Sequence, residues 1–324
     1  MRSEPSGPPS WMPSASLETL RARAVLLRQI RSFFEARGVL EVETPILSRA
    51  ATVDPQIDSF VTSDGRWLQT SPEFAMKRLL AAGCGPIWQL ARVFRVDEIG
   101  RHHNAEFSML EWYRPGWDHR QLIEECDALL QALGAASAPC EQSSYRDAFL
   151  RYAGVDPLRD PLERLRAALP GSVATLALPD GDDSARRDFV LDVLMSHVVA
   201  PMLGRAGPQV LFDFPVSQAA LARIRHDDPP VAERFEIFWR GIELANGFHE
   251  LTDAAEQRRR FEADQARRSA QGQVVPPHDA QLISAMAHGL PDCAGVAIGF
   301  DRLLMLLLGK PTVGEVIAFD DPRA

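Results

Sequence analysis

Two apolar segments joined by a charged loop, within residues 87–113, constrain the fold more than any other part of the sequence. Their alternating pattern has a period of two, which predicts a pair of β-strands. One face of the first strand carries Trp88, Leu90 and Phe94, and the other carries Gln89, Ala91, Val93 and Arg95. In the second strand, Phe107, Met109, Glu111 and Tyr113 share a face. One face of this ribbon therefore presents an arginine, an aromatic ring, a carboxylate and a phenol.

An amphipathic hairpin with one solvated face would give a similar pattern. The loop favours a binding site over that alternative, because it adds Arg101, His102, His103 and Asn104 beside rings that could stack on a planar ligand. A guanidinium suits a phosphate group, and an aromatic ring suits a base. The segment therefore predicts a nucleotide site.

The sequence FRVDE, a loop and then HNAEFSMLEWY, within residues 94–113, resembles the second signature motif of class II aminoacyl-tRNA synthetases in its lysyl form. The resemblance implies that Arg95 grips the ATP α-phosphate and that Phe107 stacks on adenine. It also implies that Glu111 and Tyr113 receive the side-chain amine of an amino-acid substrate.

The motif departs from the family pattern at one point. The family usually has Arg-Asn-Glu, where this chain has Arg95, Val96 and Asp97. Either Asp97 or Glu98 then takes the acidic role. The resemblance places Val96, Asp97 and Glu98 at the ATP and Asn104 at the amino acid.

Composition is ordinary for a soluble globular protein, with 46% hydrophobic and 24% charged residues among 324. No apolar run approaches the roughly 20 residues that cross a bilayer. Residues 1–16 are rich in Pro and Ser and lack the apolar segment of a signal peptide, so we expect a disordered lead-in and a cytoplasmic protein. The four cysteines form no C-x-x-C pair, which argues against a zinc knuckle or a disulfide framework and favours buried thiols.

The charge balance is acidic, with a net charge of −9. It argues weakly against a nucleic-acid partner, because local basic patches can coexist with an acidic total. Of the 35 basic residues only Lys77 and Lys310 are lysines. Arginine is this chain's default cation, so a single arginine carries little functional information.

Residues 17–37 have helical periodicity, Gly38 follows as a stop, and residues 39–44 alternate as a strand before Pro45. An ordinary helix–strand unit explains this pattern as well as its resemblance to the first class II motif, which implies a homodimer. Lysyl-tRNA synthetases carry an oligonucleotide-binding barrel of about 100 residues before that motif. The sequence leaves no room for it, so we expect no tRNA partner.

Ser71, Pro72 and Glu73 predict a helix start, with Ser71 as N-cap and the helix running to about residue 82. Glu73 could simply complement the helix dipole. The resemblance implies that this segment holds the amino acid, with Glu73 against its α-ammonium group. Further on, a helix is expected at 118–133 and a linker at 134–140. Residues 141–228 are less informative, with helices expected near 145–153, 162–169 and 185–199 and a strand at 210–214.

Three glutamates seven residues apart, Glu236, Glu243 and Glu250, mark the segment 234–251. The dipeptides at 240–241 and 246–247 are both turn formers. A tight turn at 246–247 would place Glu243 opposite Glu250, and like charges so placed require a cation nearby. Exposed carboxylates at a hairpin mouth are the equal alternative.

The same segment resembles the lysyl pattern Glu-Leu-Ala-Asn-Gly-Phe-x-Glu-Leu. The resemblance implies that Glu236 and Glu243 hold Mg²⁺ on the ATP phosphates, that Leu244 contacts ATP and that Glu250 binds the substrate amine. Oxygen ligands of this kind suit Mg²⁺.

Near the C-terminus, residues 295–306 predict a strand, a glycine turn and an apolar helix. Arg302 in the first helical turn is unfavourable unless it faces an anion or a ring. The segment resembles the third class II motif, which implies that Arg302 contacts the nucleotide and that Gly299 lets the backbone approach it. Lysyl-tRNA synthetases usually have Gly at the position of Ala297, which hints at an altered substrate.

Together the motifs predict an α+β fold: a class II synthetase-like catalytic domain over residues 17–324, with an antiparallel sheet flanked by helices. The chain is similar to truncated lysyl-tRNA synthetase relatives that attach (R)-β-lysine to a lysine of elongation factor P. This resemblance implies an ATP-dependent ligase with Arg95 and Arg302 as catalytic residues. A minimal lysyl-tRNA synthetase and an inactive regulatory paralogue are the alternatives. Four groups predict a substrate with two amines: Glu73, Glu111, Tyr113 and Glu250.

Overall fold

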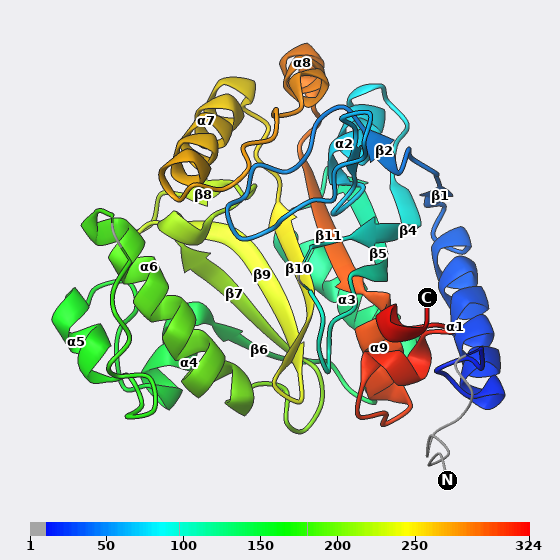
Figure 1. The fold of residues 1–324 in the computed structure, drawn as a ribbon, viewed down its shortest axis with the longest axis horizontal. Helices are drawn as coiled ribbons and strands as arrows, with labels where there is room; N and C mark the ends of the chain where they lie inside the picture. Colours follow the sequence, from blue (N-terminus) through cyan, green and yellow to red (C-terminus); the bar gives the residue numbers. More distant parts are fainter. Residues whose placement is uncertain (1–10, 97, 180) are drawn as a thin grey trace, which may run out of the picture.

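A mixed, mostly antiparallel sheet forms the centre of the fold (Figure 1). The computed structural model describes residues 11–96, 98–179 and 181–324. Within these ranges nine strands join in one sheet, in the order β1 (Leu40–Glu41), β4 (Ile87–Phe94), β5 (Glu106–Pro115), β11 (Cys293–Gly299), β10 (Ile242–His249), β9 (Val231–Trp239), β7 (Gln209–Pro215) and β6 (Glu141–Ser144), with β8 (Ile224–Arg225) paired to β9. The β1–β4 and β6–β7 pairs are parallel, and the other described pairs are antiparallel. The predicted α+β class is confirmed.

The central hairpin of β4 and β5 has the predicted faces. Gln89 pairs with Glu111 and Ala91 with Met109, so these side chains share one face of the sheet. On the opposite face, Trp88 and Trp112 are each at most 2% exposed and pack in the main hydrophobic core. The alternation read from the sequence therefore separates a core face from a face free for other uses.

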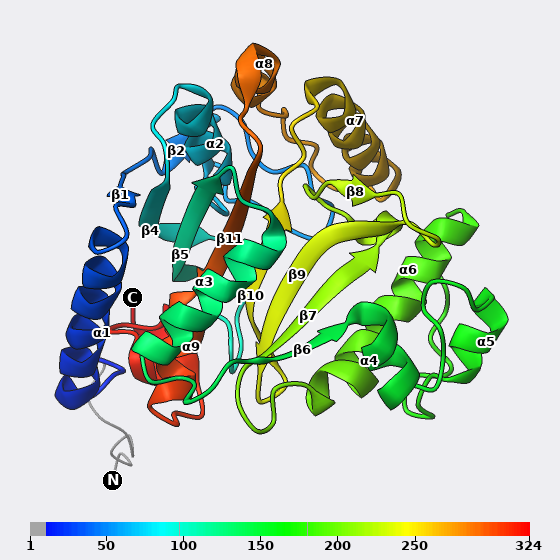
Figure 2. The ribbon, with the colours of Figure 1, turned by 180° about the vertical axis from the view of Figure 1, so that it is seen from behind.

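Three helices cover the core face: α1 (Leu17–Glu35), α3 (His119–Ala132) and α9 (Phe300–Leu307). Figure 2 shows α3 running across the back of the sheet. Phe34 of α1 stacks on Trp88 with ring centroids 4.9 Å apart, and full burial of such a side chain contributes roughly 1.5–3 kcal/mol. The predicted helices 17–37 and 118–133 are confirmed to within two residues, and Asp118 caps α3 with a capping box.

The remaining helices form two groups beside the sheet. At one end α2 (Glu73–Ala81), α7 (Ala254–Ala270) and α8 (Ala280–Gly289) pack around a small core. The other end of the sheet carries the three helices expected there: α4 (Tyr145–Tyr152), α5 (Leu162–Ala167) and α6 (Asp183–Leu194). Helix α6 continues as a π-helical turn (Met195–Val199). Strands β6 and β8 were not predicted. Short elements complete the described fold: β2 (Leu47–Ser48) paired with β3 (Trp67–Leu68), and 3₁₀ turns at Ala200–Met202, Val216–Gln218, Val313–Val316 and Asp321–Arg323.

Several local predictions were wrong. The strand expected at 39–44 is only two residues long, Leu40–Glu41. The N-cap of α2 is Pro72 and not Ser71, whose hydroxyl instead accepts from the Glu73 amide at 3.0 Å. Cys84 is exposed, whereas Cys126 and Cys293 are buried as expected.

The expected lead-in also differs from the prediction in the part that is described. The first ten residues lie outside the described ranges. The amides of Ser14 and Ala15 donate to the carbonyls of Ala318 and Ile317 at 2.8 and 3.2 Å, so this stretch is held against the C-terminal segment. In the described part of the chain, no helix has both the length and the apolar character needed to cross a membrane.

The turn expected at Asn246-Gly247 does not form. Both residues lie inside β10 and pair with β9 on one side and β11 on the other. The reversal occurs at Arg240 and Gly241, with φ of 53° and 77°, as a two-residue hairpin turn with both central residues at positive φ requires. Flanking strands on both sides of β10 outweigh the local turn preference of Asn-Gly.

Candidate active site

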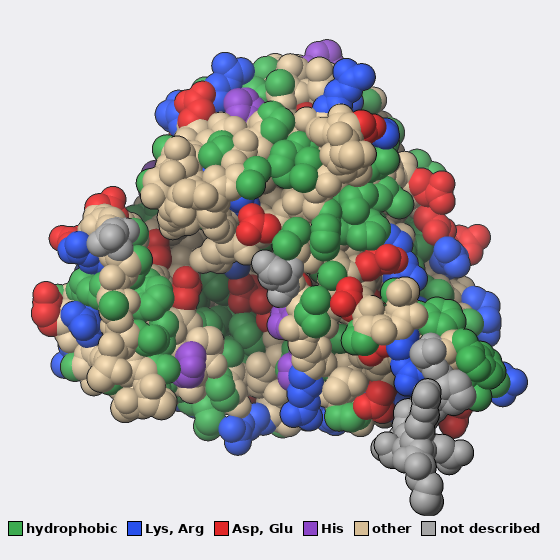
Figure 3. All heavy atoms as spheres, viewed as in Figure 1, with side chains coloured by type: hydrophobic (Ala, Val, Ile, Leu, Met, Phe, Trp, Pro, Cys, Tyr) green, Lys and Arg blue, Asp and Glu red, His purple; other side chains and the backbone are tan. Residues whose placement is uncertain are grey.

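A cavity of about 700 Å³ opens on the other face of the sheet. Figure 3 shows this face hollowed near its centre, with acidic side chains visible inside. Strands β5, β10 and β11, helices α2 and α7 and the loop of residues 49–57 contribute to its wall. The predicted site residues that line it are Ser71, Pro72, Glu73, Arg95, Glu98, Asn104, Phe107, Glu111, Tyr113, Glu243, Leu244, Glu250, Ala297, Gly299 and Arg302. Val96 and Glu236 do not line it, and Asp97 lies outside the described residues.

At one end of the cavity, a buried lysine that does not itself line the cavity lies between two carboxylates that do. Lys77 Nζ lies 2.6 Å from Glu73 Oε1 and 2.6 Å from Glu250 Oε2. Lys77 and Glu250 side chains are each 1% exposed. Burial lowers the pKa of Lys77, but the charges of Glu250 and Glu73 outweigh it and raise that pKa, so the lysine is charged. Besides this ion pair with Lys77, Glu250 Oε2 has no hydrogen-bond partner among the described residues.

A third carboxylate, Glu111, lies at the same end. It accepts hydrogen bonds from Tyr113 Oη at 2.6 Å and from Ser71 Oγ at 2.8 Å. Burial, and next the negative charge of Glu73, raise the pKa of Glu111 to about 7. Burial likewise raises the pKa of Glu250 to about 8, although Lys77 opposes the shift. Burial therefore disfavours the charged form of both carboxyls, and a nearby cation would favour it.

The charge count at this end is unbalanced. Glu73, Glu111 and Glu250 carry three negative charges when ionised, and Lys77 carries one positive charge. Two further cations would neutralise the ionised group. Buried charges are stable only when they are paired, so this end of the cavity suits a ligand with two ammonium groups.

The other end of the cavity is arginine-rich. Arg95 Nη1 lies 3.2 Å from Glu98 Oε1, and its guanidinium lies 5.2 Å from the centre of the Phe107 ring. The Nε atom of Arg95 is buried and has no acceptor among the described residues. A buried donor without an acceptor is costly. This nitrogen is therefore suited to donate to an anionic ligand that stacks on the Phe107 ring.

Arg302 projects from the first turn of α9 toward the same end. It donates to the carbonyl oxygens of His102 at 3.1 Å and Glu243 at 3.0 Å. Among the described residues no carboxylate lies within 4.0 Å of its guanidinium nitrogens. Carbonyls position this arginine without neutralising it, so its charge is available to a phosphate.

A β-bulge explains how Glu243 and Glu250 face one cavity. Seven residues separate them, so on a regular strand they would point to opposite faces. The pairing of β10 with β9 shifts by one residue between Glu243 and Ala245, and the extra residue reverses the alternation. The cation predicted for these glutamates rested on a turn at 246–247 that does not form, and Glu250 pairs with Lys77 in a different arrangement.

Glu236 lies next to the cavity wall, on β9. Its carboxylate pairs with Arg234, and burial raises its pKa to about 7. Glu243 differs, because its side chain is exposed toward the cavity and has no ion pair among the described residues. Glu243 is thus the freer of the two predicted magnesium ligands, and the role of Glu236 stays a prediction.

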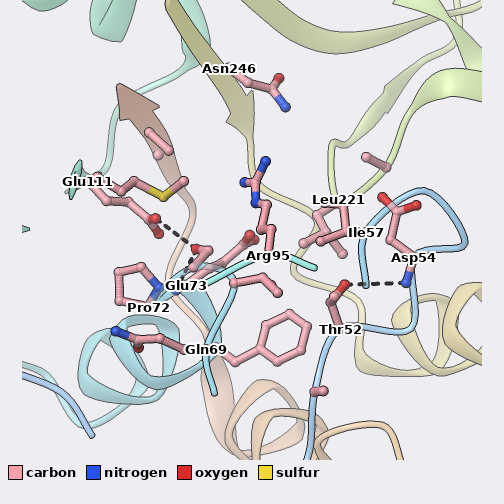
Figure 4. A pocket seen from close by; sticks show the side chains of 18 of the residues that line it. Thr52, Asp54, Ile57, Gln69, Pro72, Glu73, Arg95, Glu111, Leu221 and Asn246 are labelled. Carbon is pink, nitrogen blue, oxygen red and sulfur yellow. Dashed lines mark hydrogen bonds between the residues drawn. The ribbon is translucent and has the colours of Figure 1, made fainter. Parts of the chain in front are cut away.

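Sequence reasoning missed several residues of the cavity wall. Lys77 resembled half of an ordinary Glu–Lys pair four residues apart on a helix; its rarity in an arginine-rich chain was the available signal. Arg234 Nε donates to Asn246 Oδ1 at 3.1 Å, and both line the cavity. Figure 4 shows Glu73, Glu111, Arg95 and Asn246 around one space.

The loop 49–57 was also missed. Thr52, Asp54 and Ile57 line the cavity on the side away from Glu111 (Figure 4). Arg268 of α7 is 2% exposed and donates to the carbonyls of Val53 at 3.1 Å and Asp54 at 2.6 Å, which anchors the loop. No local pattern links Arg268 to this loop.

A family model described as tRNA synthetases class II (D, K and N) matches residues 11–323. The chain belongs to this family. Class II membership implies an ATP-dependent ligase that works through an aminoacyl-adenylate, and the family typically uses ATP with Mg²⁺. The class II residues present here fit that pair: Arg95 offers a buried donor without an acceptor beside an aromatic ring, and Glu243 offers an unpaired carboxylate.

Proposed function

We propose that this protein activates a diamino acid, (R)-β-lysine or lysine, with ATP and transfers it to a lysine side chain of elongation factor P. The observation that supports a diamino acid as the substrate is the excess of carboxylates at the closed end of the cavity. Of the amino acids that the family description names by D, K and N, only lysine brings two cationic groups. Aspartate would need a free cation, and Lys77 is already held by Glu73 and Glu250.

In the proposed arrangement Glu73 receives the ammonium group beside the substrate's carboxylate, and Glu111, Tyr113 and Glu250 receive the distal one. An amino acid without the distal amine would leave buried carboxylates unpaired, which strongly disfavours its binding. Ala297 pairs with Glu111 across β11 and β5, so its methyl group lies in the wall of this pocket. An extra methyl here fits the proposal of a substrate other than α-lysine.

The first step is attack of the substrate's carboxylate oxygen on the α-phosphorus of ATP, which forms the acyl–phosphate bond and expels pyrophosphate. Arg95 and Arg302 neutralise the developing charge and hold the line of attack. Glu243, with Glu236 as the second predicted ligand, would hold Mg²⁺, which supplies charge neutralisation on the phosphates. In the second step an acceptor amine attacks the acyl carbon, AMP leaves with the bonding electrons, and an amide forms.

The proposed partners follow from the family resemblance and the charge. The net charge of −9 disfavours broad attraction to nucleic acid, so a protein acceptor is proposed over tRNA. A homodimer is proposed through α1 and β1, where Val25 and Leu40 are 44% and 54% exposed. A cytoplasmic location also stays a prediction.

One labelling experiment separates the possible acceptors. Purified protein is incubated with ATP, Mg²⁺ and radiolabelled (R)-β-lysine or lysine, together with elongation factor P, with total tRNA, or with neither. We expect label on elongation factor P only, stable to alkali as an amide is. Label on tRNA would establish the minimal lysyl-tRNA synthetase, and no label on either acceptor would favour an inactive paralogue.

A further inference from the structure

Two histidines and a glutamate lie together away from the ATP cavity. His119 begins α3, Glu233 lies on β9 and His249 ends β10. One ligand atom from each lies within 4.8 Å of the others. None of the three lines the cavity. Glu233 and His249 lie on the two strands of one hairpin, whereas His119 lies far earlier in the chain, so the fold brings it to the other two.

His119 provides the second observation. It is 3% exposed, and neither of its ring nitrogens has a hydrogen-bond partner among the described residues. The rings of His119 and His249 lie 6.2 Å apart and nearly parallel. Since a buried polar group without a partner is costly, such groups are rare in folded proteins. The orphaned imidazole therefore points to a ligand that the protein side chains do not supply.

We infer that His119, Glu233 and His249 form a site for a borderline divalent cation such as Zn²⁺. Two imidazoles and a carboxylate are a common ligand set for zinc, whereas Mg²⁺ prefers oxygen alone. The nearest further carboxylate is Asp213, whose Oδ1 lies 3.9 Å from His119 Nε2, but Arg225 already holds it at 2.8 Å, so a water molecule would supply the fourth ligand. Ligand atoms around a tetrahedral zinc ion lie about 3.3 Å apart.

The cluster needs only side-chain adjustment to reach that geometry. His249 Nδ1 lies 2.6 Å from Glu233 Oε2, so this contact must open slightly while His119 moves inward. On the other side of the ring, His249 Nε2 lies 2.9 Å from Asp292 Oδ1. A carboxylate in that position orients a metal-bound histidine. The bound ion would tie α3 to β9 and β10 and brace the residue next to Glu250.

Zinc binding to the full-length, EDTA-treated protein tests this inference. Isothermal titration with ZnCl₂ is expected to show one ion per chain, and Co²⁺ in its place is expected to give the intense visible absorption of a tetrahedral site. His119→Ala is expected to weaken binding at least tenfold and to remove that absorption. His288→Ala, which removes an exposed histidine on α8, is the matched control and should change neither.

A folding defect in one variant would not obscure the result, because the unaltered protein is measured first. Thermal unfolding with and without Zn²⁺ gives a second readout, since a ligand of the native state raises the midpoint. Glu233→Gln should reduce that shift. The inference is overturned if the unaltered protein binds no Zn²⁺, or if both His119→Ala and Glu233→Gln bind it as tightly as the His288→Ala control.

Discussion

The ammonium group of Lys77 and the carboxylate of Glu250 lie 2.6 Å apart, and both side chains are 1% exposed. This ion pair joins α2 to the residue that follows β10, and of the two partners Glu250 lines the cavity. A buried pair of this kind adds little net stability over an apolar pair, but loss of one partner is costly. The pair therefore fixes the position of a carboxylate that the proposed substrate needs.

Lys77→Met is expected to lower the free energy of unfolding by about 3–5 kcal/mol, because it leaves buried carboxylates without their cation. Urea unfolding followed by circular dichroism measures the change. The matched control is Lys310→Met, which removes the other lysine, a half-buried one. It should change stability by no more than about 0.5 kcal/mol. Equal stability of the two variants would contradict a charged, buried Lys77.

Glu111 gives the protein a specific pH dependence. Its pKa in the folded protein is about 7, above the ordinary value of 4.5, mainly because it is buried. Between these values the folded chain binds a proton that the unfolded chain releases, so stability from this group is complete below about pH 4.5 and is lost as the pH rises through about 7. We therefore expect the free energy of unfolding of the wild type, relative to that of Glu111→Gln, to fall as the pH rises across this range.

The control for that measurement is Glu106→Gln, an exposed glutamate at the start of the same strand, with a side chain that is 52% exposed. Because this side chain is exposed, its replacement should change the free energy of unfolding by no more than about 0.5 kcal/mol. If the free energies of unfolding of wild type and Glu111→Gln changed with pH in parallel, Glu111 would ionise as an ordinary carboxyl. This result would contradict a buried pocket that is rich in carboxylates.

Much of the fold could be predicted because local patterns and burial agree. In the β4–β5 hairpin every second residue contacts the core, so the alternation that places Trp88 inside also places Glu111 on the other face. Helices α1 and α3 have both an apolar stripe and a capping residue. The same alternation places Phe107, Glu111 and Tyr113 in the cavity wall, whereas other predicted site residues, such as Arg95, Glu98 and Arg302, reach the cavity from a loop or from the start of α9.

The failures have a common cause in contacts distant along the chain. Asn246-Gly247 has strong turn chemistry, yet pairing with two neighbouring strands keeps it in β10. The bulge that turns Glu243 toward Glu250 has no local sequence signal. Lys77 pairs with Glu250, which lies far along the chain, so no local pattern indicates this contact.

Gly295→Ala tests the shape of the amine pocket. A Cβ at this position would collide with the Tyr113 ring and lie 2.6 Å from Glu250 Oε1. We expect affinity for the diamino acid to fall at least tenfold while ATP affinity is unchanged, measured by equilibrium dialysis with each ligand. Gly207→Ala is the control, because a Cβ there meets no atom within 4 Å. An unaffected Gly295→Ala would place the amino acid elsewhere.

Arg95→Ala tests the phosphate end. Loss of a preorganised donor to developing charge lowers kcat by roughly 10²–10³-fold, and we expect a loss of this size in adenylate formation. Arg92→Ala, on the same strand, is the control: its side chain is 46% exposed and lies 3.7 Å from Glu106 in a surface pair. Stopped-flow measurement of pyrophosphate release gives the rate. Similar rates for the two variants would remove Arg95 from the reaction.

The most direct test of the account is amino-acid-dependent ATP–pyrophosphate exchange, because it reports adenylate formation without any acceptor. Purified protein is assayed with (R)-β-lysine, lysine, asparagine and aspartate at equal concentrations. The account predicts exchange with one or both diamino acids and none above background with asparagine or aspartate. Exchange driven by aspartate, with neither lysine isomer active, would contradict the claim that this cavity holds ATP beside a substrate with two amines.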